Sequence, residues 1–220
     1  MDSSSSFNAG EFFIALKNND ADKISDMLRG IDEEELKLLL LSEVENREPN
    51  FFTRGYPIKL AYVYDARCLS LILDKLSPSF RLEILRANFA SKHPSCHYYP
   101  IFMNVLFVIC TRAEKSKLEV LGVIRQHLSS EDWRQLVFTT DGDGVTMINY
   151  LLRHGDSKEF HGCLKFILDS VDANDRVPLI QLRGVDGRSA VSFITPGPVG
   201  LTSLKLLAGC LDNPDLLNLF

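Results

Sequence analysis

The sequence predicts an all-α protein in which about five similar helical units follow one another along the chain. From Glu11 onward, apolar residues recur at positions i, i+3 and i+4, and no alternating apolar–polar run is sustained. Two kinds of helix start also recur, at spacings between 40 and 52 residues. Repetition at this spacing is typical of helical solenoids, in which each unit packs only on its neighbours.

The first recurring feature is an aliphatic residue followed at once by Ser or Asp. Both are preferred N-cap residues, because their side-chain oxygens accept hydrogen bonds from unpaired N–H groups of the first helical turn. Each pair therefore predicts the end of one helix and the start of a short third helix in its unit. The pairs are Ile31-Asp32, Leu76-Ser77, Leu128-Ser129, Val171-Asp172 and Leu211-Asp212, spaced by 45, 52, 43 and 40 residues.

The second feature marks the start of the first helix in each unit. Pro57 and Pro100, each between Tyr and Ile, lie 43 residues apart. Proline suits the first helical position, where its missing N–H needs no partner. Met147 follows 47 residues after Pro100, and Ala190 follows 43 residues after Met147. We therefore expect a flexible leader at 1–9 and a repeat domain at 10–220, with units at about 10–53, 54–96, 97–143, 144–186 and 187–220.

Residues 140–156 hold a turn followed by a short helix. Asp141, Gly144 and Thr146 spell D-x-x-G-x-T, in which the glycine permits a positive φ and Thr146 can cap the helix. This stretch resembles the start of an ankyrin repeat, T-P-L-H-x-A, with Thr146 at the threonine position and Asn149 at that of the histidine. The resemblance implies helix pairs joined by hairpin turns and a concave groove that binds other proteins.

The units are longer than the 33 residues of a standard ankyrin repeat, by roughly one short helix. HEAT or armadillo-like helical repeats also suit this length, and the hairpin fingers between units can be shortened or lost. Long, degenerate ankyrin units with a capped third helix resemble those of effector proteins from intracellular bacteria. In such an effector the array targets a host protein in the host cytosol.

Composition argues against several classes of function. The formal net charge of −5 and the isoelectric point near 5.6 disfavour binding of nucleic acid through broad phosphate neutralisation. The five cysteines are scattered and mostly lie in apolar runs, which is typical of a reduced, cytoplasmic chain. No signal peptide is visible, and the longest apolar stretch, 101–110, is far shorter than the roughly 20 residues of a membrane span. We expect a cytoplasmic monomer without a cofactor.

An enzyme is the main competing interpretation. Asp141 and Asp143 also fit the D-x-D-G motif of haloacid-dehalogenase phosphatases, where two carboxylates flank Mg²⁺. That motif requires a preceding strand within a βαβ alternation. Residues 130–138 have a helical pattern instead, so the turn of a repeat is the favoured interpretation.

Two further clusters of reactive residues are weaker candidates. His93, Cys96 and His97 offer three zinc ligands within five residues, but a structural site needs a fourth ligand and none is spaced to supply it. His161 and Cys163 suggest a cysteine protease, together with the nearby 154–156 segment, but no oxyanion element is apparent. We therefore expect neither a metal site nor catalytic residues.

The expected function is non-catalytic recognition of another protein. Aromatic and basic residues gather near the tips and first helices of units 2 and 3, and residues 51–100 carry 7 bases against 3 acids. Tyr and Arg are enriched at binding hot spots. The alternative is that these rings pack between units and the array is purely structural. The expected partner-binding residues are Arg54, Tyr56, Tyr64, His97, Tyr98, Tyr99, Arg153, His154 and Arg188.

Overall fold

The structure is a computed structural model. It describes residues 7–41, 44–48, 51–55, 65–87, 89–91, 101–103, 105–111, 117–141, 144–153, 158–184, 186–194 and 197–211. Most of these residues are helical, so the predicted helix-dominated fold is confirmed. None of the described helices is both long and apolar enough to cross a membrane.

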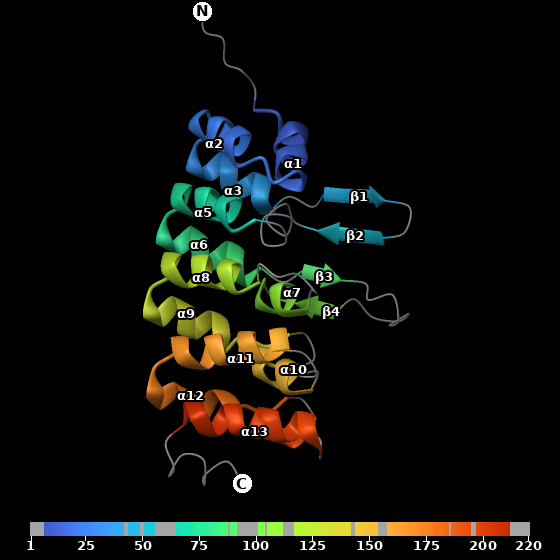
Figure 1. The fold of residues 1–220 in the computed structure, drawn as a ribbon. Coiled ribbons are helices and arrows are strands. Elements are labelled where there is room, and N and C mark those ends of the chain that lie inside the picture. The colour runs from blue at the N-terminus through green and yellow to red at the C-terminus, as the bar shows by residue number, and fades with distance from the viewer. Residues whose placement is uncertain are drawn as a thin grey trace, which may run out of the picture.

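The helices form three columns along one axis (Figure 1). The first column holds α1 (Ala9–Lys17), α7 (Val105–Thr111), α10 (Met147–Arg153) and the 3-10 helix η1 (Ala190–Phe193). The second holds α2 (Ala21–Arg29), α5 (Ala66–Lys75), α8 (Lys117–His127), α11 (Lys158–Ser170) and α13 (Pro198–Cys210). The third holds α3 (Glu33–Leu41), α6 (Pro78–Arg86), α9 (Ser130–Val137) and α12 (Ala173–Gln181).

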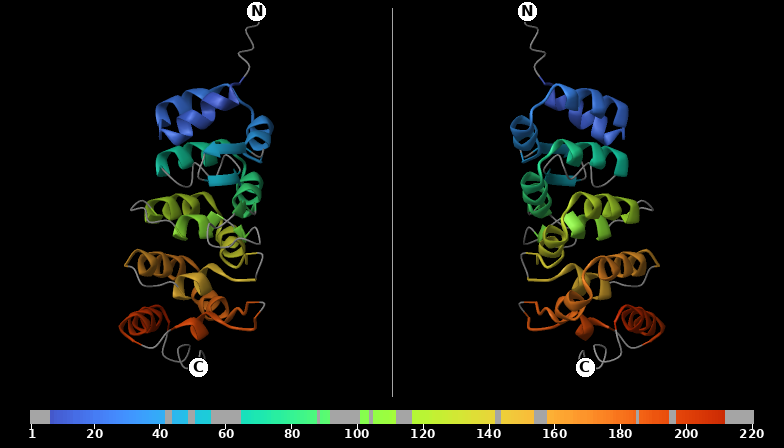
Figure 2. Two further views of the ribbon diagram at one scale, coloured as in Figure 1. Left: turned by 90° about the vertical axis from the view of Figure 1, so that its right-hand side faces the viewer. Right: turned by 90° about the vertical axis from the view of Figure 1, so that its left-hand side faces the viewer.

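Consecutive helices of different columns make up layers. Layer 1 is α1, α2 and α3, layer 2 contains α5 and α6, layer 3 is α7, α8 and α9, layer 4 is α10, α11 and α12, and layer 5 contains η1 and α13. Each second-column helix packs on the next one along the chain, from α2 to α5, α8, α11 and α13. Figure 2 shows the layers in this order from one end of the molecule to the other.

Two antiparallel hairpins extend from one side of the stack (Figure 1). The first pairs β1 (Val44–Glu48) with β2 (Phe51–Gly55), and the second pairs β3 (Phe89–Ser91) with β4 (Ile101–Met103). They interrupt the helical pattern expected after Glu11. A strand of three to five residues has too few alternations to produce a period-2 signal, which explains why the sequence pattern missed both hairpins. β2 also lies beside β3, so the two hairpins are neighbours.

The predicted caps mark real helix starts. Ser129 Oγ accepts a hydrogen bond from the amide of Asp132 at 3.0 Å, and Asp32 Oδ1 accepts one from the amide of Glu35 at 2.8 Å. Ser77 and Asp172 also lie at helix starts, although neither side chain makes a capping bond there. Asp212 lies outside the described residues. The aliphatic residue before each of the five predicted caps is buried, with 2–8% of its surface exposed, namely Ile31, Leu76, Leu128, Val171 and Leu211.

A continuous apolar core runs through all five layers, from Phe12 to Leu211. Trp133, on α9, is its largest fully buried side chain. The indole Nε1 donates to Ser170 Oγ at 3.0 Å, and the ring meets Phe166 edge-on with centroids 6.4 Å apart. Both partners are on α11, so this single side chain joins layer 3 to layer 4.

Candidate binding surface

The turn after α9 has the geometry that the D-x-x-G-x-T sequence predicts. Asp141 Oδ1 accepts a hydrogen bond from the amide of Val145 at 2.8 Å, and Gly144 has a φ of 70°. Thr146 is fully buried, and its Oγ1 accepts from the amide of Asn149 at 3.1 Å, which caps α10. The carboxylate of Asp141 thus holds a turn that leads into a helix.

A second turn repeats this backbone 43 residues later. Gly184 N donates to Arg188 O at 3.0 Å, as Asp141 N donates to Val145 O at 3.0 Å. Gly187 N donates to Gly184 O at 2.9 Å, as Gly144 N donates to Asp141 O at 3.1 Å, and Gly187 has a φ of 74°. The two turns also touch, because a Cβ on Gly184 would lie 3.4 Å from Gly144 O. Equivalent turns therefore stack directly on one another.

Four connections follow the third-column helices of successive layers and precede the next described helix of the stack. We call them together the finger edge. They are the β1–β2 hairpin, the β3–β4 hairpin, the turn at 140–146 and the turn at 184–188. Because the two hairpins extend from the packed columns (Figure 1), they offer backbone to a partner without disturbing the core.

The structure places three of the nine expected binding residues. Arg54 lies in β2 opposite Glu45, and Arg153 is the last residue of α10. Arg188 is exposed at the end of the 184–188 turn, where its Nε lies 3.9 Å from Asp186 Oδ2. Two of the three therefore belong to the finger edge. The other six expected residues, Tyr56, Tyr64, His97, Tyr98, Tyr99 and His154, lie outside the described residues.

Sequence reasoning missed Arg183 on this edge. Its side chain is exposed, and Nη1 donates to Gly187 O at 2.6 Å, so it braces the same turn that Arg188 closes. The sequence indicates the turn, since Asp186-Gly187 follows Asp143-Gly144 by 43 residues, but it does not show that Arg183 braces it. Together these two guanidinium groups place positive charge at the tip of the 184–188 turn.

Charged residues on the second and third columns hold neighbouring layers together. Within the third column, Lys37 Nζ lies 2.8 Å from Glu83 and Arg134 Nε lies 2.9 Å from Asp175. The hydrogen bond to Asp175 raises the pKa of Arg134 above its usual value. Within the second column, Arg67 pairs with Asp22 at 2.8 Å, and His127 Nε2 lies 3.0 Å from Asp74 Oδ1.

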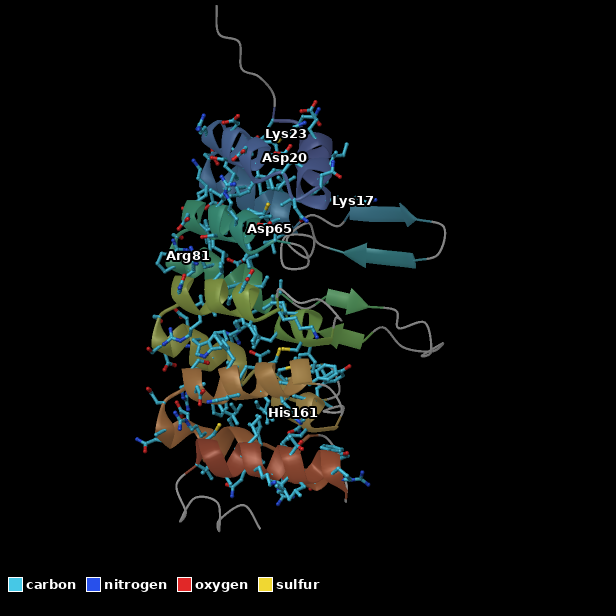
Figure 3. All side chains as sticks on the ribbon, in the orientation of Figure 1. Lys17, Asp20, Lys23, Asp65, Arg81 and His161 are labelled. Carbon is cyan, nitrogen blue, oxygen red and sulfur yellow. The ribbon has the colours of Figure 1, made fainter. Side chains whose placement is uncertain are left out.

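A further hydrogen bond between layers recurs at the residue four positions after a cap. In three layers this residue donates to the last residue of the second-column helix in the next layer. The pairs are Arg81 Nη1 with His127 O (3.3 Å), Trp133 Nε1 with Ser170 Oγ (3.0 Å) and Arg176 Nη1 with Cys210 O (2.7 Å). Arg81 lies on the side of the stack away from the hairpins (Figure 3). Arginine and tryptophan side chains at this position thus both link one layer to the next.

The catalytic and metal alternatives gain no geometric support among the described residues. His161 Nε2 lies 3.5 Å from Ser203 Oγ on α13. Cys163 is fully buried and forms a thiol hydrogen bond with Cys110, which together with burial raises the pKa of Cys110 well above its usual value. A nucleophilic thiol must be accessible to its substrate, whereas Cys163 is fully buried. No group of three metal-ligating side chains converges in this part of the chain, and Asp143, His93, Cys96 and His97 lie outside it.

Comparison with protein-family models, with curated proteins and with solved structures finds no match for this chain. The resemblance to ankyrin repeats accordingly remains a prediction, supported by the residues and turn geometry of this chain alone.

Proposed function

We propose that this chain is a non-catalytic protein-interaction module, built as an ankyrin-like array of five helical layers. The observation that carries the proposal is the pair of matching turns at 140–146 and 184–188. They share hydrogen bonds, positive-φ glycines and an offset of 43 residues, and they stack in contact. A turn of this kind ahead of a short capped helix is the unit that the ankyrin resemblance implies.

The contacts between layers also support an array. The polar contacts described above between different layers join residues 34 to 53 positions apart, which is the distance from one layer to the next. An assembly in which each unit contacts only its neighbours grows along one axis and leaves an extended surface for recognition. The second and third columns use charged side chains to hold layers together, which leaves the finger edge and the first column for a partner.

The chemistry expected of the partner follows from the binding residues that the sequence predicts. Tyr56, Tyr64, Tyr98 and Tyr99 are proposed as anchors, since desolvated aromatic rings supply much of the binding energy at protein interfaces. Arg54, Arg153 and Arg188 are proposed as electrostatic contacts, together with the imidazoles at 97 and 154. A partner with an acidic patch beside apolar pockets suits this set. If the chain acts as a bacterial effector, that partner is a host protein in the host cytosol.

The turn geometry also favours a binding role over a phosphatase. The Asp141 carboxylate accepts the amide hydrogen of Val145 and so serves the turn, and the segment before it is α9 rather than a strand. Purified protein with Mg²⁺ is expected not to hydrolyse generic phosphomonoesters. Turnover that disappears in Asp141→Asn would overturn the non-catalytic assignment.

Affinity capture from lysate, followed by binding measurements with the purified partner, tests the proposal. Arg188→Glu and the Tyr64→Ala/Tyr98→Ala double variant are expected to weaken binding by tenfold or more. Lys75→Glu, which changes an exposed charge in the last turn of α5, is the matched control and should bind as wild type does. All variants must keep the wild-type thermal melt. Undiminished binding by both Arg188→Glu and the double tyrosine variant would place the partner elsewhere, and a folded chain that retains no partner would favour a purely structural array.

A further inference from the structure

The first hairpin has one strand edge without a described neighbour. β1 pairs with β2, from Val44 opposite Gly55 to Glu48 opposite Phe51. Beyond this pair, β2 lies beside β3, and β4 contacts α7. Among the elements that the structure describes, only β2 packs closely against β1. Figure 1 shows β1 as the strand of this row that lies farthest from the second hairpin, so its far side is the outer edge of the row.

The register of the hairpin decides which backbone groups point to that edge. Glu48 and Phe51 are opposite each other, and only two residues connect them. A non-hydrogen-bonded pair here would need hydrogen bonds between these two connecting residues, which are adjacent in the chain, so Glu48 and Phe51 form a hydrogen-bonded pair. The two kinds of pair alternate along an antiparallel ladder. The N–H and C=O groups of Glu45 and Arg47 therefore point away from β2, toward the outer edge.

These backbone groups match one kind of ligand, an extended chain. Two N–H groups and two C=O groups, on residues two positions apart, repeat the spacing at which a strand presents its own donors and acceptors. An edge strand of this kind is a template for pairing with another chain. A helix cannot use it, because the backbone groups of a helix are already bonded within the helix. The complementary element is therefore an additional strand.

The sequence of β1, V-E-N-R-E, restricts which strand can pair there. Charged residues on an edge strand oppose pairing with generic apolar strands. Positions 45 and 47 share one face of β1 and carry charges of opposite sign. Opposite charges directly across a sheet stabilise pairing, whereas like charges destabilise it. A segment with a basic residue opposite Glu45 and an acidic residue opposite Arg47 satisfies both positions.

We propose that an extended segment of the partner adds to the outer edge of β1 as an antiparallel strand. Its acidic residue lies opposite Arg47, and its basic residue, two positions later, lies opposite Glu45. Main-chain hydrogen bonds supply the docking, and the two charges select the segment. The inference rests on the binding function proposed above and specifies the form that the partner takes at this part of the finger edge.

A synthetic peptide tests the pairing without a captured partner. Its sequence, Thr-Lys-Glu-Thr-Lys-Val-Thr, places glutamate opposite Arg47 and lysine opposite Glu45. At saturating peptide, amide exchange at Glu45 and Arg47 should slow by about tenfold or more, as measured by NMR. The control peptide, Thr-Glu-Lys-Thr-Glu-Val-Thr, reverses these charges and should bind about fivefold more weakly.

Two substitutions at one position separate the backbone from the side chain. Arg47→Pro and Arg47→Ala both remove the guanidinium group, but only proline also removes the amide hydrogen. Because that amide points to the outer edge, pairing with β2 does not need it. Arg47→Pro should bind the peptide about tenfold more weakly than Arg47→Ala does.

The amide of Asn46 shows whether the hairpin survives the substitution. Asn46 and Thr53 form a hydrogen-bonded pair, so this amide should exchange slowly wherever β1 and β2 remain paired. If Arg47→Pro loses this protection, the wild-type chain is titrated instead with the peptide N-methylated at its glutamate. That peptide should bind about tenfold more weakly than the unmodified one, because it lacks the amide that donates to Arg47 O.

Three results would overturn the proposal. One is exchange at Glu45 and Arg47 that the peptide does not slow. Another is equal binding by Arg47→Pro and Arg47→Ala or, where the hairpin is lost, by the methylated and unmodified peptides. The third is protection at these two amides that grows with protein concentration alongside a dimer in sedimentation, which would assign the edge to a second copy of the chain.

The captured partner distinguishes this inference from the binding proposal on which it rests. A partner that binds but leaves exchange at Glu45 and Arg47 unchanged would overturn the strand addition and leave the binding proposal standing. A chain that pairs with the peptide but captures no partner would overturn the binding proposal alone.

Discussion

Replacing Trp133 by Phe should destabilise the chain by about 2 kcal/mol. The substitution removes the 3.0 Å hydrogen bond to Ser170 Oγ, and the net contribution of such a bond is about 0.5–1.5 kcal/mol. It also leaves part of a fully buried site unfilled, where complete truncation of a large aromatic side chain costs about 3–5 kcal/mol. Ser170 keeps a partner in the variant, because its hydroxyl also donates to Ile167 O at 2.9 Å.

A double-mutant cycle separates the hydrogen bond from the packing. Trp133→Phe, Ser170→Ala and the double variant are compared by urea unfolding, followed by circular dichroism because Trp133 is the only tryptophan of the chain. We expect a coupling free energy of about 0.5–1.5 kcal/mol between the two positions. Coupling below about 0.3 kcal/mol, within the scatter of additive sites, would refute the bond between layers 3 and 4. A total cost below about 0.5 kcal/mol for Trp133→Phe would contradict its burial, since such small effects are typical of surface sites.

Three further substitutions test local features by unfolding measurements. Gly187→Ala should lower the free energy of unfolding by about 1–2 kcal/mol through its positive φ alone, because no described atom lies within 4 Å of the added Cβ. Gly122→Ala, within α8, should instead raise the free energy of unfolding by up to about 1 kcal/mol. Equal effects of the two would contradict the turn geometry. Asn149→Leu should stabilise by about 1–2 kcal/mol, since the buried side-chain amide of Asn149 has no hydrogen-bond partner among the residues that the structure describes. A loss of stability would instead reveal a partner for this side chain. Glu33 accepts a hydrogen bond from the amide of Ser77, which lowers the pKa of Glu33 below its usual value of 4.5. Its stabilising contribution should therefore be complete at neutral pH and decline as the pH falls below about 4.5 toward the lowered pKa, so the difference in unfolding free energy between wild type and Glu33→Gln should shrink with falling pH. A difference that stays constant from pH 7 down to the acid end of the range in which both fold would exclude this charge as its cause.

The local features of the fold could be predicted from the sequence, whereas the contacts between layers could not. Asp32 and Ser129 cap helices through bonds to residues three positions away, so their pattern is visible in the sequence. Ser77 marks a helix start as predicted, but its amide binds Glu33 from the preceding layer. Such a contact depends on how layers stack, and periodicity within one segment carries no information about it.

The same limit applies to the ties that join the layers. Arg81 and Trp133 perform equivalent tasks at equivalent positions, although their side chains have little in common. No residue pattern marks that equivalence, and only the geometry reveals it. For the binding surface, the sequence correctly placed the turn at 140–146. It missed both hairpins because their strands are too short to show alternation, and it missed Arg183 because a bracing role requires the folded turn.

The central claim is that the array recognises a partner along its finger edge. The most direct test is a hydrogen-exchange footprint of the chain with and without the captured partner. The account predicts slower exchange in the complex at 44–55, 89–103, 140–146 and 184–188, with unchanged exchange along α2, α5 and α8. Slower exchange along those second-column helices, with no change at the hairpins and turns, would contradict it.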